Sequence, residues 1–248
     1  MCESFKRSSL LVVTTIMAAT ASAAQYQVQE IKTAGSISGK VLLGNAKVEG
    51  ETFTITKDVE KCGSETHTVE WVRANGDALL DVVVYLEDVD AGKAFPKEAE
   101  AIVVDQKNCR FTPYLQVMAN GSEIKVINPD PILHNVRAYE LLPTADNSTM
   151  RRTIFNVSLP DFETFARKVS LRRAQALKLE CSAHSAMHAW VFLARNPYYA
   201  LVDENGAFAI TDVPPGNYVI KSWHGRLGEQ ESNVEVKADA EAVVTFSY

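Results

Sequence analysis

Leu177-Lys-Leu-Glu-Cys181-Ser-Ala-His184-Ser-Ala-Met187 joins a strand pattern directly to a group of metal-binding side chains. Apolar and polar residues alternate up to Cys181, which predicts a β-strand whose leucines and cysteine point into one core. The chain is then expected to turn, and His184 and Met187 follow Cys181 at three-residue spacing. Thiolate, imidazole and thioether groups are ligands that copper selects. This stretch therefore predicts a metal site at the end of a buried strand of a β protein.

A second candidate ligand comes from Asn128-Pro-Asp-Pro-Ile-Leu-His134-Asn-Val, in which His134 lies 47 positions before Cys181. Two imidazoles, one thiolate and a weak axial thioether form the ligand set of blue-copper electron-transfer centres. We therefore predict one mononuclear copper ion, and its expected ligands are His134, Cys181, His184 and Met187. Asn135, directly after the first ligand, is expected to brace the ligand loop by hydrogen bonds.

Part of this set of candidate ligands also permits a different site geometry. Cys181, His184 and His188 would share one face of a helix, as in a zinc-like cluster. The alternating pattern before Cys181 favours a loop, and His188 is then expected to face solvent or to donate a hydrogen bond to the site. His67 lies in a polar run and is expected at the surface, and His224, at the end of a strand pattern, is expected to have no metal role.

The first 23 residues have the features of a secretory signal. Lys6 and Arg7 precede an apolar core from Leu10 to Ala19, and Ala21-Ser-Ala23 is a small-residue cleavage site. Removal of these 23 residues and their net charge of +1 leaves 225 of the 248 residues, with a formal net charge of −7 instead of −6. We expect a periplasmic or secreted protein without membrane insertion, and its acidic charge argues against a nucleic-acid partner.

Three cysteines follow the signal, so one of them stays unpaired in an oxidising compartment. Cys181 has His and Met beside it and is the natural free thiol. We therefore expect a disulfide between Cys62 and Cys109, which would stabilise the fold by about 3 to 4 kcal/mol through the entropy of the unfolded chain.

Short apolar or alternating runs separated by Gly, Pro, Asn and Asp predict an all-β protein. Val82-Val-Val-Tyr-Leu86 is a continuous apolar run, typical of a strand buried on both faces. Near the C-terminus, Asn205-Gly206 and Pro214-Pro-Gly216 mark the turns of a meander. Residues 143–165 contain prolines and polar residues and are expected to form a long loop.

Residues 102–193 resemble a cupredoxin, the Greek-key β-sandwich of blue-copper proteins. The resemblance rests on Phe111-Thr-Pro, Gly121, the segment around His134, and Cys181-x-x-His184-x-x-Met187, whose spacing is similar to the short ligand loop of the amicyanin branch. Residues 198–224 look like the carboxypeptidase regulatory-like, or transthyretin-like, β-sandwich. The chain resembles exported proteins that pair these features, some of them labelled as methylamine-utilisation proteins. The expected fold is a cupredoxin sandwich plus a second small β-sandwich.

The expected domains are N-terminal strands at 34–95, a cupredoxin domain at 96–195 and a regulatory-like sandwich at 196–248. The opening strand pattern and Val82–Leu86 also look like strands of the regulatory-like sandwich. This suggests that residues 34–90 and 196–248 build one sandwich into which the cupredoxin is inserted, because insertion is tolerated where chain ends lie close together.

The expected function is that of an exported type 1 copper protein that carries single electrons between redox partner proteins. Four protein ligands imply no open coordination position, so the chain is expected not to be an enzyme. His184, between Ala183 and Ala186, is expected to lie nearest the surface and to provide the docking face. The alternative is a periplasmic protein that binds copper for delivery or storage, since Cu(I) also favours Cys and Met. A third possibility is an adhesive or structural β protein whose metal site has decayed.

Overall fold

The computed structural model of the protein describes residues 26–63, 65–144 and 148–248. The expected signal at 1–23 lies outside these ranges. The described chain is built from short strands, and its helices are limited to α1 (Val59–Cys62) and one 3-10 turn at Lys97–Ala99. The prediction of an all-β fold is therefore confirmed. In the described part of the chain, no helix has the length and apolar character needed to cross a membrane.

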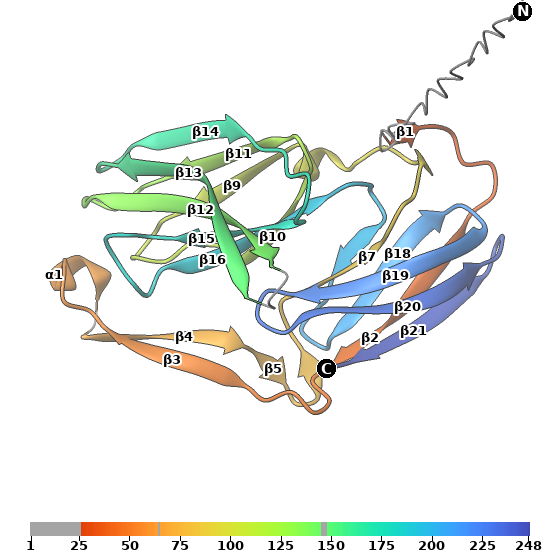
Figure 1. Ribbon diagram of the computed structural model, residues 1–248, viewed down its shortest axis with the longest axis horizontal. Helices are drawn as coiled ribbons and strands as arrows, with labels where there is room; N and C mark the ends of the chain where they lie inside the picture. The colour runs from red at the N-terminus through yellow and green to blue at the C-terminus, as the bar shows by residue number, and fades with distance from the viewer. Residues whose placement is uncertain (1–25, 64, 145–147) are drawn as a thin grey trace, which may run out of the picture.

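The middle of the chain forms two facing sheets, here called the metal-site sandwich (Figure 1). In spatial order, its larger sheet contains β10 (Leu115–Ala119), β16 (His188–Ala194), β15 (Ala176–Glu180), β12 (His134–Pro143) and β13 (Thr149–Leu159). Its smaller sheet contains β14 (Thr164–Lys168), β11 (Glu123–Ile127) and β9 (Ala101–Asp105). The β10–β16 and β9–β11 pairs are parallel and the others are antiparallel.

Strands from both ends of the chain form a second pair of sheets, here called the flanking sandwich. One sheet contains β17 (Tyr199–Leu201), β7 (Val82–Leu86), β19 (Gly216–His224) and β20 (Gly228–Val236). The other contains β18 (Ala207–Val213), β2 (Gly35–Leu42), β6 (Ala78–Leu79) and β5 (Ala74–Asn75), and β21 (Glu241–Ser247) also pairs with β2. Strands β2 and β7 thus pair with strands that follow the metal-site sandwich in sequence, as the insertion hypothesis expects. The short β1 (Gln27–Val28) pairs with β8 (Ala91–Gly92).

Close approach of β2 to β21 requires a glycine in β2. A Cβ atom at Gly39 would lie 1.7 Å from the carbonyl oxygen of Val244, so no side chain fits there. The parallel pairing of β2 with β21 therefore depends on a residue without Cβ.

Strands β7 and β16 are buried on both faces. In β16, Ala189, Val191 and Leu193 pack into the core of the metal-site sandwich. The residues between them pack into another apolar cluster, in which β7 contributes Val83 and Tyr85. The rings of Tyr85 and Phe192 are 5.0 Å apart between centroids. This shared cluster joins the two sandwiches and confirms the two-sided burial expected for Val82–Leu86.

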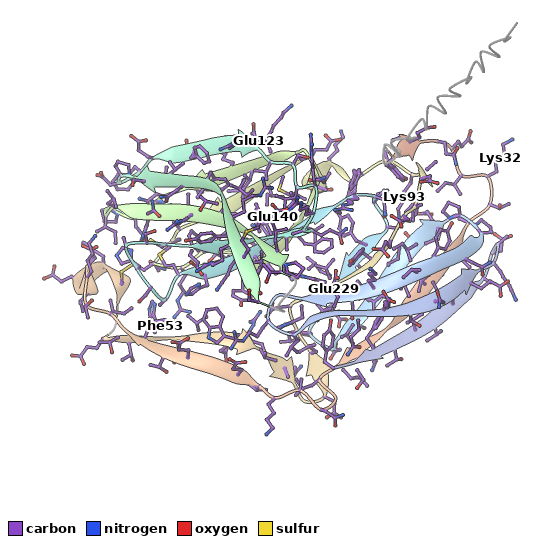
Figure 2. The ribbon with its side chains drawn as sticks, viewed as in Figure 1. Lys32, Phe53, Lys93, Glu123, Glu140 and Glu229 are labelled. Carbon is purple, nitrogen blue, oxygen red and sulfur yellow. A yellow bond between two sulfur atoms is a disulfide. The ribbon has the colours of Figure 1, made fainter. Side chains whose placement is uncertain are left out.

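The β3–β4 hairpin lies across the metal-site sandwich and is here called the arm, residues 49–72. It consists of β3 (Glu49–Thr54), α1 at its tip and β4 (Thr66–Val72). Figure 1 shows the arm in orange beside β15 and β16, and Figure 2 labels Phe53 on β3. The Phe53 ring lies 5.9 Å from the ring of His188, between centroids. The arm is bonded covalently to the metal-site sandwich by the expected disulfide between Cys62 and Cys109, which the structure confirms.

The loop expected over residues 143–165 is largely a strand instead. Strand β13 pairs with β12 over almost its whole length, from Thr149 to Leu159. It is an edge strand with mostly exposed side chains, so no apolar alternation marks it in the sequence. Main-chain hydrogen bonds hold it, together with an ion pair between Arg152 and the fully buried Glu140, labelled in Figure 2.

The disulfide gives a direct test of how firmly the arm is attached. Replacing both Cys62 and Cys109 by Ala should lower the free energy of unfolding by about 4 kcal/mol, because the unfolded chain regains the entropy of an open loop. Urea denaturation of the variant and the parent, both under oxidising conditions, measures this difference. Equal midpoints and slopes would show that the cross-link adds nothing to stability.

Candidate metal centre

The ligand loop begins where β15 delivers Cys181 into the core. Leu177, Leu179 and Cys181 belong to one buried cluster, so the predicted inward direction of the cysteine is confirmed. The loop is closed by two backbone hydrogen bonds, from Cys181 N–H to the Met187 carbonyl at 3.2 Å and from Met187 N–H to the His184 carbonyl at 3.1 Å. Residues 181–187 contain no helix and β16 starts at His188, so the helical, zinc-like arrangement is wrong.

Three of the four expected ligands converge on one point. His134 stands at the start of β12, and its Nδ1 lies 3.1 Å from Nδ1 of His184. The Cys181 Sγ atom is 3.7 Å from the same His184 Nδ1 atom. Met187 is buried in the same core cluster and follows the same loop. His134, Cys181 and His184 are all buried and offer ligand atoms within 4.8 Å of one another.

A carboxylate holds the outer nitrogen of each histidine. Nε2 of His134 lies 2.8 Å from Oδ2 of Asp130, and Nε2 of His184 lies 3.0 Å from Oδ2 of Asp58. An ionised carboxylate only accepts hydrogen bonds, so each Nε2 donates its proton to an Asp, and Nδ1 is the ring atom left to bind a metal ion. The donor set of two imidazole nitrogens and one thiolate fits a copper ion.

The thiol group of Cys181 is surrounded by hydrogen-bond donors. Burial by itself raises the pKa of the Cys181 thiol, but hydrogen bonds from His184 and from the backbone of Asn135 and Ala183 hold the pKa below its ordinary value. The Asn135 N–H lies 3.4 Å from Sγ, and the Asn135 side-chain oxygen accepts from Ser182 N–H at 3.4 Å. Asn135 therefore lies where a brace for the loop would lie. Stabilised thiolate is the form that binds metal.

The expectation that His184 lies nearest the surface is wrong. Its side chain is only 2% exposed, because Asp58 and the neighbouring residues of the arm cover it. Residues 54–57 of the arm face residues 183–185 of the ligand loop across a cavity of only about 30 Å³. The carboxylate that completes this contact is 126 positions away from His184 in the sequence, and no local motif marks it. Asp130, in contrast, lies inside the segment that the sequence already singled out around His134.

The surroundings of the other histidines give them structural roles. His67 is buried, contrary to expectation, because it lies on the inward face of β4. Burial and then the charge of Arg110 lower its pKa. His188 donates from Nε2 to the Ser185 carbonyl at 2.7 Å, and its side chain is mostly buried, so it makes the expected type of hydrogen bond without facing solvent.

His224 holds a turn. Its Nδ1 accepts from the backbone N–H groups of Arg226 and Leu227, both at 3.1 Å, and burial lowers its pKa to about 4. None of the groups of metal-binding side chains found among the described residues includes His224. Its neutral ring acts as a hydrogen-bond acceptor in the turn that follows β19.

A cleft leads to Cys181 from the side of the arm. It has a volume of about 580 Å³ and lies between the arm, strands β15 and β16, and the turn after β19. Its aromatic lining is Phe53, Trp71 and Trp190. Lys178, 5.1 Å from the centre of the Trp71 ring, lies among them. Cys181 thus lines an aromatic cleft, whereas the arm covers the side chain of His184.

Comparisons with solved structures found likenesses that each cover less than half of this chain. Amicyanin in the Cu(I) form is 16% identical and covers 38% of this chain and 82% of its own, with a TM-score of 0.30. A purple cupredoxin from Nitrosopumilus maritimus is 17% identical, with coverages of 38% and 98% and a TM-score of 0.29. A copper-containing nitrite reductase from Thermus scotoductus is 14% identical, with coverages of 44% and 25% and a TM-score of 0.29. No family model matches, and the search of curated proteins found no match.

Asp130 links the histidine ligand to the backbone beside the disulfide. Burial raises the pKa of Asp130, but hydrogen bonds from the backbone of Cys109, the His134 ring and the backbone of Asn108 outweigh it and hold the pKa below its ordinary value. A carboxyl group with a depressed pKa stabilises the fold above its unfolded pKa of about 4 and loses this effect as the pH falls through the folded pKa.

Asp130→Asn in the metal-free protein should therefore lower the free energy of unfolding by about 2 kcal/mol at pH 7. The difference from the parent should shrink at pH 3, where the parent carboxyl group is also becoming neutral. Urea denaturation at both pH values measures it, and Asp161→Asn, at an exposed position, is the control. A difference that is the same at both pH values would contradict this account of Asp130.

Proposed function

We propose that this chain is an exported type 1 copper protein that carries single electrons between redox partners. The observation that supports the proposal most directly is the convergence of Nδ1 of His134, Nδ1 of His184 and Sγ of Cys181 in a buried pocket. Copper bound there would supply one-electron chemistry between Cu(II) and Cu(I). Met187, buried in the same cluster, is proposed as the weak fourth ligand.

The residues of the site serve to keep the ligands in place. Asp130 and Asp58 orient the two rings, and Asn135 and the short hydrogen-bonded loop orient the thiolate. The ligands are almost completely removed from water, because the core cluster and the arm surround them. A rigid, dry site suits electron transfer because little rearranges when the charge changes. With four protein ligands, we propose an electron carrier and not an enzyme.

A redox partner would approach by the cleft and not over His184. The cleft reaches Cys181, and Trp71 and Trp190 line it. The burial of His184 under Asp58 argues against contact at that ring. The partner itself is proposed only as a protein that can present a small group to this cleft.

The burial of the site also favours a second function, the holding of copper without rapid electron transfer. A ligand set that is almost completely buried slows electron exchange but also slows the loss of metal, which suits storage or delivery. Rates of oxidation and reduction by small soluble redox reagents distinguish the two. Turnover in milliseconds supports the carrier, and very slow exchange with tight retention of Cu(I) supports the holding protein.

Copper addition to the metal-free protein tests the leading proposal. The parent should develop an intense visible absorption band from thiolate bound to Cu(II), and reduction should bleach it. Cys181→Ser should lose this band, whereas His188→Gln should keep it, because His188 lies beside the loop without joining the ligand group. A parent protein without the band, or a Cys181→Ser variant that retains it, defeats the proposal.

A further inference from the structure

The tip of the arm, which is not part of the metal-site sandwich, covers one side of the candidate metal centre. Strand β3 ends at Thr54, and α1 starts at Val59, so Asp58 lies in the turn that passes over the ligand loop. Its Oδ2 atom accepts a hydrogen bond from Nε2 of His184 over 3.0 Å. The carboxylate itself is partly solvent-accessible, with 28% of its side chain exposed, while the ring beneath it is closed off.

The backbone at Asp58 is held in a conformation that most residues avoid. Its φ is 53° and its ψ is 34°, in the left-handed region, where Asp and Asn are among the few side chains found regularly. The Asp58 carbonyl accepts hydrogen bonds from the N–H groups of Lys61 and Cys62, both at 2.9 Å, so α1 fixes this geometry. Residues held in this region cluster at functional sites, where the surroundings enforce them.

The disulfide fixes the turn at the metal centre. Cys62 ends α1 and is bonded to Cys109. Both sulfur atoms and a ring nitrogen of His184 lie within 4.8 Å of one another. Cys109 N–H donates to Oδ2 of Asp130, the same atom that His134 contacts. One continuous chain of bonds and hydrogen bonds therefore runs from His184 through Asp58, α1 and the disulfide to Asp130 and His134.

We propose that Asp58 is a positioning residue of the metal centre. By accepting the Nε2 proton it holds the His184 ring with the Nδ1 lone pair directed toward Cys181 and His134. Its fixed negative charge, next to a ligand in a site removed from water, favours the more positively charged oxidation state of a bound metal. The part of this inference that concerns oxidation states rests on the proposed copper function, whereas the part that concerns the ring orientation does not.

An ordinary surface ion pair would have little such effect, since water and salt screen exposed charges. The contact here differs because the ring is buried, the carboxylate comes from a covalently tethered turn, and the opposite nitrogen faces the other ligands. The arm thus places Asp58 next to His184, although the two residues lie far apart in the sequence.

The reduction potential of the copper-loaded protein is the first readout. Asp58→Asn removes the charge but keeps an oxygen acceptor, and Asn tolerates the left-handed backbone. We expect Cu(I) to be favoured over Cu(II) about tenfold more strongly than in the parent, which is a rise of about 59 mV for one electron. Asp88→Asn is the matched control, because Asp88 is exposed and also has a positive φ of 49°. An unchanged potential in Asp58→Asn would overturn the charge effect.

The second readout needs no copper. The chain has only five histidines, so nitrogen NMR of the metal-free protein can resolve the His184 ring. The parent should carry the proton on Nε2 of His184, with slow exchange with solvent. Asp58→Gly, which keeps the left-handed backbone without strain, should lose this protection, and Asp88→Gly should retain it. An unchanged His184 signal in Asp58→Gly would overturn the positioning role.

The two readouts separate the two proposals. If the parent develops no copper colour, the proposed function fails, and the NMR comparison alone decides whether Asp58 positions His184. If the colour appears, Asp58→Asn has the parent potential and Asp58→Gly leaves the His184 signal unchanged, the copper function stands and the inference about Asp58 is wrong.

Discussion

Burial of β16 on both faces is the constraint on which the rest of the molecule depends. One face of β16 completes the core under the ligand loop, and the other packs with β7 of the flanking sandwich. A glycine at 225 lets the turn after β19 approach Trp190 so closely that a Cβ there would lie 2.5 Å from the ring. Because this junction packs the two sandwiches against each other, an arm that leaves the flanking sandwich reaches the metal-site sandwich in a defined place.

The arm determines which side chains of the candidate site are accessible. Residues 54–58 of the arm lie directly against His184 and its neighbours in the loop from Cys181 to Met187. The tip of the arm covers that histidine with a carboxylate and is tied down by the disulfide beside it. The two histidines are then held in the same way, each with its outer nitrogen on an Asp and its inner nitrogen toward the thiolate. Access shifts from the histidine to the cleft beside Cys181.

Prediction from the sequence succeeded where a few consecutive residues carried the pattern or where few cysteine pairings were possible. The inward direction of Cys181 followed from strict alternation in Leu177–Cys181, and the disulfide followed from an odd cysteine count. The two-sided burial of Val82–Leu86 followed from its unbroken apolar run. Prediction failed for strand 149–159, whose edge position leaves its side chains mostly exposed, and for His67, whose polar neighbours suggested exposure. It also failed for His184, which was expected to lie nearest the surface between Ala183 and Ala186. Both histidines are buried by contact between the arm and the metal-site sandwich, which involves segments far apart in the chain.

The sequence by itself determined which side chains the candidate site offers, because one histidine, one cysteine, a second histidine and one methionine, in that order, give a nitrogen-and-sulfur donor set. It also determined those strands whose side chains alternate, since alternation is a property of a few consecutive residues. Only the tertiary structure decided that Asp58 and Asp130 orient the two rings and that His184 is closed to solvent. Those features depend on atoms brought together across as many as 126 positions, where no spacing in the sequence records the distance in space.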